Sequence, residues 1–296
     1  METQVEKFLN YYNYYVSSTF LPDESNIIDF LEIFSEKGIK NIELGSNHIF
    51  CEDIYNYDFI KFNTLVHNHF PPSKNNLIIN ITSDDEYIRK SSVDFIKKSI
   101  SFSKDISAKL YTFHPGFKSD PISTSNSKLN YDFIWEEKND EFNNNLIKKL
   151  FKNSLDQIIN HSKKIGQQIA IETEGSISKS KLLLMQNLED VEKFKQDYYP
   201  DDIGINLNIG HLNLAKKKYN FDEIEFYNLI NDYIVAFECS HNSSNEDEHL
   251  PLIENDWYWN ILKMGENLKK PKILEYRNLS FDEVIDSIML VQKQYE

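Results

Sequence analysis

Short apolar runs rich in β-branched and aromatic residues recur along the chain and alternate with longer stretches of helical periodicity. Such runs predict strands, and the stretches between them are long enough for crossover helices or loops. The predicted strands cover residues 11–16, 41–45, 62–67, 110–114, 168–173, 204–208, 234–241 and 272–276. Eight strands that alternate with helices predict an α/β fold, a single (β/α)₈ TIM barrel over residues 1–296.

Three helices are predicted to begin at a capping residue that is followed three positions later by glutamate. The pairs are Ser83 and Glu86, Asn220 and Glu223, and Ser280 and Glu283. Residues 117–133 are rich in Ser and Asn, are weakly periodic and follow a predicted strand end. We expect an inserted loop there, which is either a lid over the site or an ordered surface insertion.

The amino-acid composition and the net charge disfavour some classes of partner and location for this protein. Hydrophobic residues make up 40% of the 296 residues, which is enough for a sizeable core. The net charge of −15 and the presence of only two arginines, Arg89 and Arg277, disfavour nucleic acid as a partner. Two cysteines, no apolar N-terminal run and no long apolar stretch lead us to expect a cytoplasmic protein with no membrane partner.

Histidines and carboxylates fall at the ends of the predicted strands. The histidines are His67, His114, His211, His241 and His249, and the acidic residues are Glu43, Glu172, Asp247 and Glu275. In a (β/α)₈ barrel the carboxyl ends of the strands meet at one mouth, so these side chains predict a shared metal site. Imidazole nitrogen and carboxylate oxygen suit Zn²⁺, Mn²⁺ or Fe.

Six motifs in order give residues 62–276 a specific resemblance. They are Val66-His67 with Asn80-Ile81-Thr82-Ser83, Phe113-His114-Pro115-Gly116, Ile171-Glu172-Thr173-Glu174-Gly175, Leu207-Asn208-Ile209-Gly210-His211, His241 with Asp247-Glu248-His249, and Leu274-Glu275. This pattern resembles the xylose-isomerase-like TIM-barrel superfamily, which includes sugar isomerases, sugar epimerases and endonuclease IV-like apurinic nucleases. The substrate depends on the variable loops.

The resemblance implies a central ion held by Glu172, Asn208, His241 and Glu275. Its nuclease-like members add ligands that match His67 and His114, and a further cluster that matches His211, Asp247 and His249. Asn208 stands where the superfamily has aspartate, so we expect weaker binding or a different number of ions. His69 is an alternative to His67 because the two share a strand face, but the motif alignment favours His67.

The leading hypothesis is a metal-dependent isomerase or epimerase of a sugar or sugar phosphate. Glu172 and Glu275 would exchange protons with neighbouring carbons, and His211 and Arg277 would contact the substrate. Lysines of residues 216–218 are an alternative anion contact. The main alternative function is an endonuclease IV-like phosphodiesterase, and a third is a non-catalytic barrel that serves as a scaffold. A homo-oligomer is possible under each hypothesis.

Overall fold

Eight parallel strands close into a barrel in the computed structural model, which describes residues 3–21, 25–45, 48–74, 77–124, 133–135 and 142–296. Around the barrel the order is β1-β2-β3-β4-β7-β8-β9-β10, so each strand pairs with the next barrel strand along the chain. The strands are β1 (Tyr14–Ser17), β2 (Asn41–Leu44), β3 (Asn63–His67), β4 (Tyr111–Phe113), β7 (Ile169–Glu172), β8 (Gly204–Asn208), β9 (Ile234–Cys239) and β10 (Lys272–Leu274). The prediction of a (β/α)₈ barrel is confirmed.

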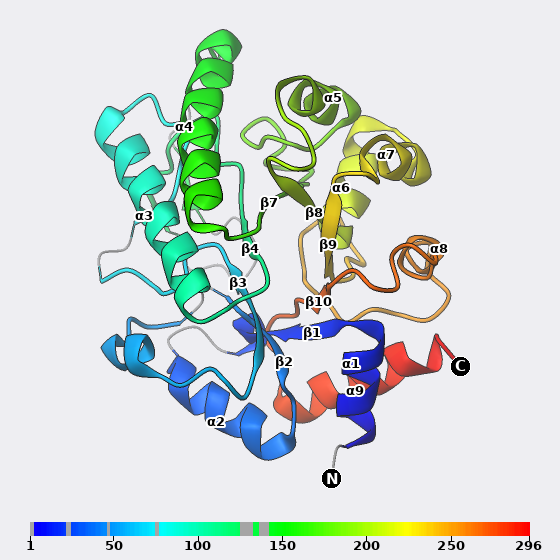
Figure 1. Ribbon diagram of the computed structural model, residues 1–296. Helices are drawn as coiled ribbons and strands as arrows, with labels where there is room; N and C mark the ends of the chain where they lie inside the picture. Colours follow the sequence, from blue (N-terminus) through cyan, green and yellow to red (C-terminus); the bar gives the residue numbers. More distant parts are fainter. Residues whose placement is uncertain (1–2, 22–24, 46–47, 75–76, 125–132, 136–141) are drawn as a thin grey trace.

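Helices surround the strands on the outside of the barrel (Figure 1). They are α1 (Gln4–Tyr12), α2 (Ile27–Lys37), α3 (Glu86–Asp105), α4 (Asn144–Ile165), α5 (Leu188–Asp197), α6 (Ile209–Tyr219), α7 (Glu223–Ile230), α8 (Trp259–Leu262) and α9 (Phe281–Lys293), with the 3₁₀ helices η1 (Ser18–Phe20) and η2 (Glu52–Asn56). The first and last of them, α1 and α9, lie side by side (Figure 1). Among the described helices, none combines the length and the apolar character needed to cross a membrane.

The chain enters the first strand later than the aromatic run predicts. Tyr11 and Tyr12 end α1, and Asn13, whose φ of 57° lies in the left-handed region, separates that helix from β1. Tyr11 is 80% exposed. The start of the predicted first strand is therefore wrong, because a left-handed Asn ends the helix inside a run of strand-favouring residues.

One of the three predicted helix starts is confirmed. Ser280 and Glu283 form a capping box at α9, with each side chain bonded to the backbone N–H of the other residue. For α3 and α7 the cap is an aspartate directly before the helix, Asp85 and Asp222, so the capping residues predicted for these helices are wrong. These aspartates lie beside the first helical residue, where a carboxylate accepts two backbone N–H bonds at once.

The barrel interior changes from apolar to polar along the strands. The part of the interior nearer the amino ends of the strands holds an apolar cluster, which consists of Tyr15, Leu65, Leu110, Ala170, Ala236 and Ile273. One step further along the strands, buried polar side chains share this inward face, among them Ser17, Glu43, His67, Thr112, Glu172, Asn206 and Glu238. Intervening residues such as Phe237 and Cys239 pack in the core between strands and helices. The polar layer therefore lies at the carboxyl ends of the strands, above a closed apolar base.

Part of the predicted insertion forms a small structure on the barrel. Strands β5 (Ser123–Thr124) and β6 (Phe133–Ile134) pair antiparallel. Phe117 and Leu183 form a separate apolar cluster, against which Phe133 and Trp135 pack. Residues 125–132 of the predicted loop lie outside the described residues, and its role as a lid or as a surface insertion stays a prediction.

Candidate metal centre

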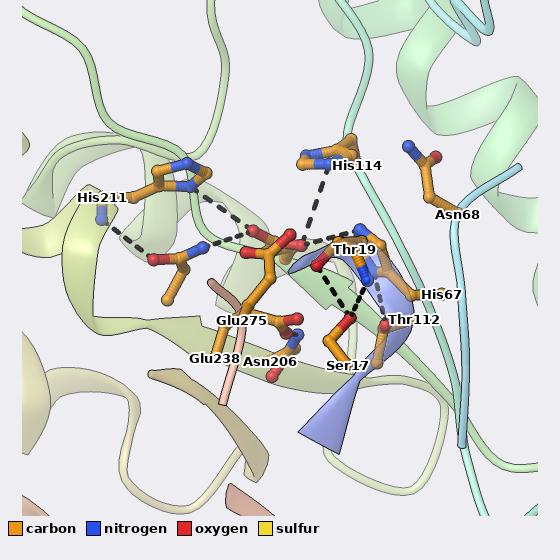
Figure 2. Close-up of polar contacts among 12 residues, drawn as sticks. Ser17, Thr19, His67, Asn68, Thr112, His114, Asn206, His211, Glu238 and Glu275 are labelled. Atoms are coloured by element: carbon orange, nitrogen blue, oxygen red, sulfur yellow. Dashed lines mark hydrogen bonds and ion pairs between the residues drawn. The ribbon is translucent and has the colours of Figure 1, made fainter. Parts of the chain in front are cut away.

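A first group of possible metal ligands contains His67, His114 and Glu172. Each offers one ligand atom, and these atoms all lie within 4.8 Å of one another. The Nδ1 of His67 is 2.8 Å from the Thr112 hydroxyl, which leaves its Nε2 3.6 Å from Oε2 of Glu172. The Nε2 of His114 lies 3.9 Å from the same carboxylate oxygen. Figure 2 shows both histidines pointing into one space beside Glu275.

Glu174 orients His114 and was not among the predicted site residues. Its Oε1 lies 2.7 Å from Nδ1 of His114, so that Nε2 faces Glu172. A carboxylate on the far nitrogen of a histidine is a common support for a metal ligand. Burial acts to lower the pKa of His114, but the charges of Glu172 and Glu174 raise it to about 9. The signal in the sequence was the spacing of two, which gives Glu172 and Glu174 the same orientation in an extended chain.

A second group contains His211, Asp247 and His249, whose ligand atoms also lie within 4.8 Å of one another. The Nε2 atoms of His211 and His249 are 3.1 Å and 3.0 Å from Oδ2 of Asp247. Asn242 donates from Nδ2 to the other Asp247 oxygen at 3.1 Å and holds the carboxylate in place. Although burial opposes it, the two histidines hold the pKa of Asp247 well below its usual range.

Asn208 connects the two groups. Its Oδ1 accepts the backbone N–H of His211 at 3.0 Å as the cap of α6, and its Nδ2 donates to Oε1 of Glu172 at 2.8 Å. The chain after β7 passes so close to α6 that a Cβ on Gly175 would lie 1.9 Å from the His211 carbonyl oxygen. Glycine at this position therefore allows the close approach that brings Glu172, Asn208 and His211 together.

Glu275 lies next to both groups. Its Oε2 is 3.1 Å from Nδ1 of His249. Burial acts to raise the pKa of Glu275, but His249, His67 and Arg277 lower it strongly. Arg277, a predicted substrate contact, donates its backbone N–H to the His249 carbonyl at 3.2 Å, and its charge acts on Glu275. In Figure 2 Glu275 points between His211 on one side and His67 with His114 on the other.

The structure does not bring His241 to the other predicted ligands. Its Nδ1 lies 3.2 Å from Oδ2 of Asp256, and its backbone pairs with Leu250. The inward position near the end of β9 belongs to Glu238, which is the register partner of Asn208. His241 lies two residues beyond the end of β9 and is not in any of the groups of possible ligands found among the described residues, so its role as a ligand of the central ion stays a prediction.

Glu238 and Glu43 form a third group with His67, again with ligand atoms within 4.8 Å of one another. Glu43 is one of the acidic strand-end residues that predict the metal site, whereas Glu238 is not among the predicted site residues. Burial, followed by the charge of Glu275, raises the pKa of Glu43 to about 8. Burial and the charge of Glu43 likewise raise the pKa of Glu238. The signal for Glu238 was its position between Phe237 and Cys239, two apolar residues of the opposite face.

The described residues fit a divalent cation. Several buried carboxylate oxygens have no hydrogen-bond partner: both oxygens of Glu43, Oε2 of Glu172 and Oε1 of Glu238. Unpartnered buried polar atoms are costly, and carboxylates beside imidazoles are ligands for Zn²⁺, Mn²⁺ or Fe. The residues of the three groups and Glu275 would hold such an ion.

Comparisons with known proteins agree with this fold. A family described as "Xylose isomerase-like TIM barrel" matches residues 53–289. An uncharacterised protein of Methanocaldococcus jannaschii is 28% identical over 274 residues, which are 90% of this chain and 93% of that protein.

Among solved structures, a D-tagatose 3-epimerase-like protein superposes with a TM-score of 0.69 at 18% identity, over 96% of this chain and 97% of that chain. A D-psicose 3-epimerase, solved in the presence of D-fructose, superposes at 0.63 with 10% identity, over 96% of each chain. Endonuclease IV from Thermus thermophilus superposes at 0.61 with 8% identity, over 96% of this chain and 97% of that chain. The closed parallel barrel and the match over most of its length show that the chain belongs to the xylose isomerase-like TIM barrel family.

Proposed function

We propose that the protein is a divalent-metal-dependent isomerase or epimerase of a sugar or sugar phosphate. The observation that carries the proposal is that Glu172 and Glu275, from strands on different sides of the barrel, reach the same buried space. Both carboxylates act on the pKa of His67, and both raise that of Glu43. Proton transfer between neighbouring carbons of a sugar needs two such groups beside one binding position.

Each residue of the site has its own role in the proposed proton transfer. A bound divalent cation would polarise the carbonyl and the adjacent hydroxyl of an open-chain sugar. Glu275, which His249, His67 and Arg277 hold ionised, takes the proton from the carbon next to the carbonyl. The electron pair of that C–H bond becomes the double bond of an enediolate as the carbonyl pair moves onto oxygen. Glu172 delivers a proton taken up from solvent to the acceptor carbon. His211, with Nδ1 2.9 Å from the Thr173 carbonyl oxygen and Nε2 3.1 Å from Asp247, would contact a substrate oxygen only after giving up one of these partners. Arg277 contacts a hydroxyl or phosphate group.

Solvent exchange tests this proposal directly. The Mn²⁺-loaded or Zn²⁺-loaded protein is incubated in D₂O with ketoses and aldoses, free and phosphorylated, and deuterium incorporation is followed by NMR. We expect exchange at a carbon next to the carbonyl, and a loss of at least about 10²-fold in Glu172→Gln and in Glu275→Gln. Glu6→Gln is the matched control, because Glu6 is a buried carboxylate on α1 that pairs with Lys40. We expect this variant to exchange deuterium as the wild type does. Exchange that persists in both site variants would refute the assigned roles.

A phosphodiesterase related to endonuclease IV is the second candidate. The two compact groups of possible ligands favour it, because several closely spaced ions suit in-line displacement at phosphorus. The first group is His67, His114 and Glu172, and the second is His211, Asp247 and His249. The net charge of −15 opposes it. Incision of a duplex with an abasic site by the metal-loaded protein, absent in Glu172→Gln, would establish this function in place of the isomerase.

A further inference from the structure

Asn68 directly follows the last residue of β3 and leaves the strand conformation. Its φ of 52° lies in the left-handed region, which asparagine adopts more readily than most non-glycine residues. Because β3 ends at His67, Asn68 lies at the carboxyl end of a barrel strand, where the mouth is. The left-handed backbone takes Asn68 out of the alternation of the strand, so its side chain is not confined to the face opposite His67.

The backbone of Asn68 is held at both of its polar groups. Its N–H donates to the Thr112 carbonyl oxygen at 2.7 Å, and its carbonyl oxygen accepts the Tyr111 hydroxyl at 2.8 Å. Both partners belong to β4, the next barrel strand, and Tyr111 is fully buried. The barrel therefore fixes the conformation of Asn68 and the direction of its Cα–Cβ bond.

The side-chain carboxamide of Asn68 remains available to a ligand. None of the described residues forms a hydrogen bond with it, and it is not among the buried polar atoms that are sealed from solvent without a partner. Solvent therefore reaches the carboxamide, although Asn68 as a whole is only 8% exposed. Figure 2 shows it pointing toward His114, on the opposite side of the centre from His211. A side chain that a rigid backbone directs at the site, with its polar atoms unpaired, is suited to contact a bound molecule.

The chemistry of the carboxamide indicates which group of the substrate it contacts. A carboxamide does not titrate, so Asn68 takes no part in proton transfer, but it both donates and accepts hydrogen bonds. A sugar hydroxyl also donates and accepts, so the two groups are complementary. We propose that Asn68 binds a hydroxyl group of the sugar outside the reacting carbons and favours sugars that present a hydroxyl there. The inference rests on the proposed function for the class of substrate.

Two glycine variants test this role. Glycine adopts a positive φ without strain, so Asn68→Gly removes the carboxamide and keeps the backbone conformation. Asn220→Gly is the matched control, because Asn220 is an exposed asparagine with a φ of 55° that follows α6 at the end remote from His211. We expect both variants to unfold thermally close to the wild-type temperature.

Deuterium exchange from D₂O into D-fructose, D-psicose and D-tagatose is measured with the Mn²⁺-loaded proteins over a range of sugar concentrations. For the sugar that the wild type exchanges best, we expect Asn68→Gly to raise KM about five- to tenfold and to keep kcat within about twofold. A hydrogen bond to a non-reacting hydroxyl contributes equally to the bound sugar and to the transition state, so its loss affects binding and not chemistry. The control keeps both constants. A merely structural role of Asn68 would lower kcat through loss of active protein and would leave KM unchanged.

Binding calorimetry identifies the hydroxyl group without turnover. The probes are the best-bound of the three ketoses and its monodeoxy analogues, each of which lacks one hydroxyl outside the reacting carbons. We expect the wild type to bind one analogue about five- to tenfold more weakly than the parent sugar. Asn68→Gly should bind that analogue and the parent sugar equally, because neither pair retains the hydrogen bond.

The outcomes separate this inference from the proposed function. If the wild type exchanges sugar protons but Asn68→Gly changes neither KM nor the affinity for any analogue, the role of Asn68 is refuted and the proposed function stands. A fall in kcat at unchanged KM refutes the role as well. If the wild type binds a ketose through Asn68 but exchanges no proton, the role is supported and the proposed function fails. A wild type that binds none of these sugars refutes the role of Asn68 directly.

Discussion

Replacing Asn208 by aspartate adds a carboxylate next to Glu172 and is expected to have opposite effects with and without metal. In the metal-free protein Asn208 donates from Nδ2 to Oε1 of Glu172 at 2.8 Å, and its Oδ1 accepts the N–H of His211. Aspartate keeps the helix cap, because it accepts the same N–H bond. It loses the donor and places two carboxylate oxygens against each other.

The size of the effect follows from this geometry. Two unit charges separated by 2.8 Å repel by about 6 kcal/mol at an effective dielectric constant of 20. Uptake of a proton limits this cost, because holding a proton on an aspartate at pH 7 costs about 4 kcal/mol and restores a donor. We therefore expect Asn208→Asp to lower the free energy of unfolding of the metal-free protein by about 4 kcal/mol. With a divalent cation bound, the added charge should tighten binding at least about tenfold, which is about 1.4 kcal/mol of extra stabilisation.

Urea unfolding of the metal-free and the Mn²⁺-loaded protein measures both effects. Asn41→Asp is the matched control, because Asn41 is a buried asparagine that donates to the backbone carbonyls of Leu9 and Tyr14 outside the site. We expect the control to be destabilised equally with and without Mn²⁺. An Asn208→Asp protein with unchanged metal-free stability would refute the repulsion argued from the Glu172 contact, and one with no larger gain from Mn²⁺ than the wild type would show that Asn208 does not lie at a cation position.

Two further predictions concern stability. Gly175→Ala is expected to cost about 3 kcal/mol in urea unfolding, because its Cβ would lie 1.9 Å from the His211 carbonyl oxygen. Gly265→Ala, with nothing within 4 Å, should stay within about 0.5 kcal/mol of the wild type, and an equal loss in both variants would contradict the steric argument. Burial lowers the pKa of His48 from its usual value of 6.5 to about 4, so between these two values the unfolded chain binds a proton that the folded protein does not. Stability should therefore fall as the pH falls from 6.5 toward 4, and at pH 5 His48→Gln should escape about 2 kcal/mol of the wild-type loss relative to pH 7. Parallel pH profiles of the two proteins would refute this assignment.

The fold was predictable because each barrel strand carries its own local signal. Apolar runs separated by helical periodicity occur wherever the structure has a barrel strand, and the capping box at Ser280 marks the start of α9. The first strand was misplaced because five of residues 11–16 are Tyr or Val, which favour strand, while Asn13 in the left-handed conformation ends the helix within that run. Propensity identifies an element more reliably than it places its ends.

The site was predictable in part. His67, His114 and Glu172 come together, as do His211, Asp247 and His249, because each of these residues ends a barrel strand or lies in the segment that follows one. His241 is not in these groups, because the chain has left β9 at Cys239 and the His241 side chain lies beside Asp256. Strand alternation alone favoured Glu238, whose neighbours Phe237 and Cys239 are apolar.

The sequence by itself determined which residues alternate along each strand and which chemical groups are available at its end, because both depend on local spacing and residue type. It could not determine which groups meet. Glu43 and Glu238 approach each other only after the barrel closes through β1 and β10, and Asn208 bonds to Glu172 only in the register that pairs Glu172 with Asn206. Contacts across a barrel depend on closure and on register between distant strands, and these are properties of the folded chain as a whole.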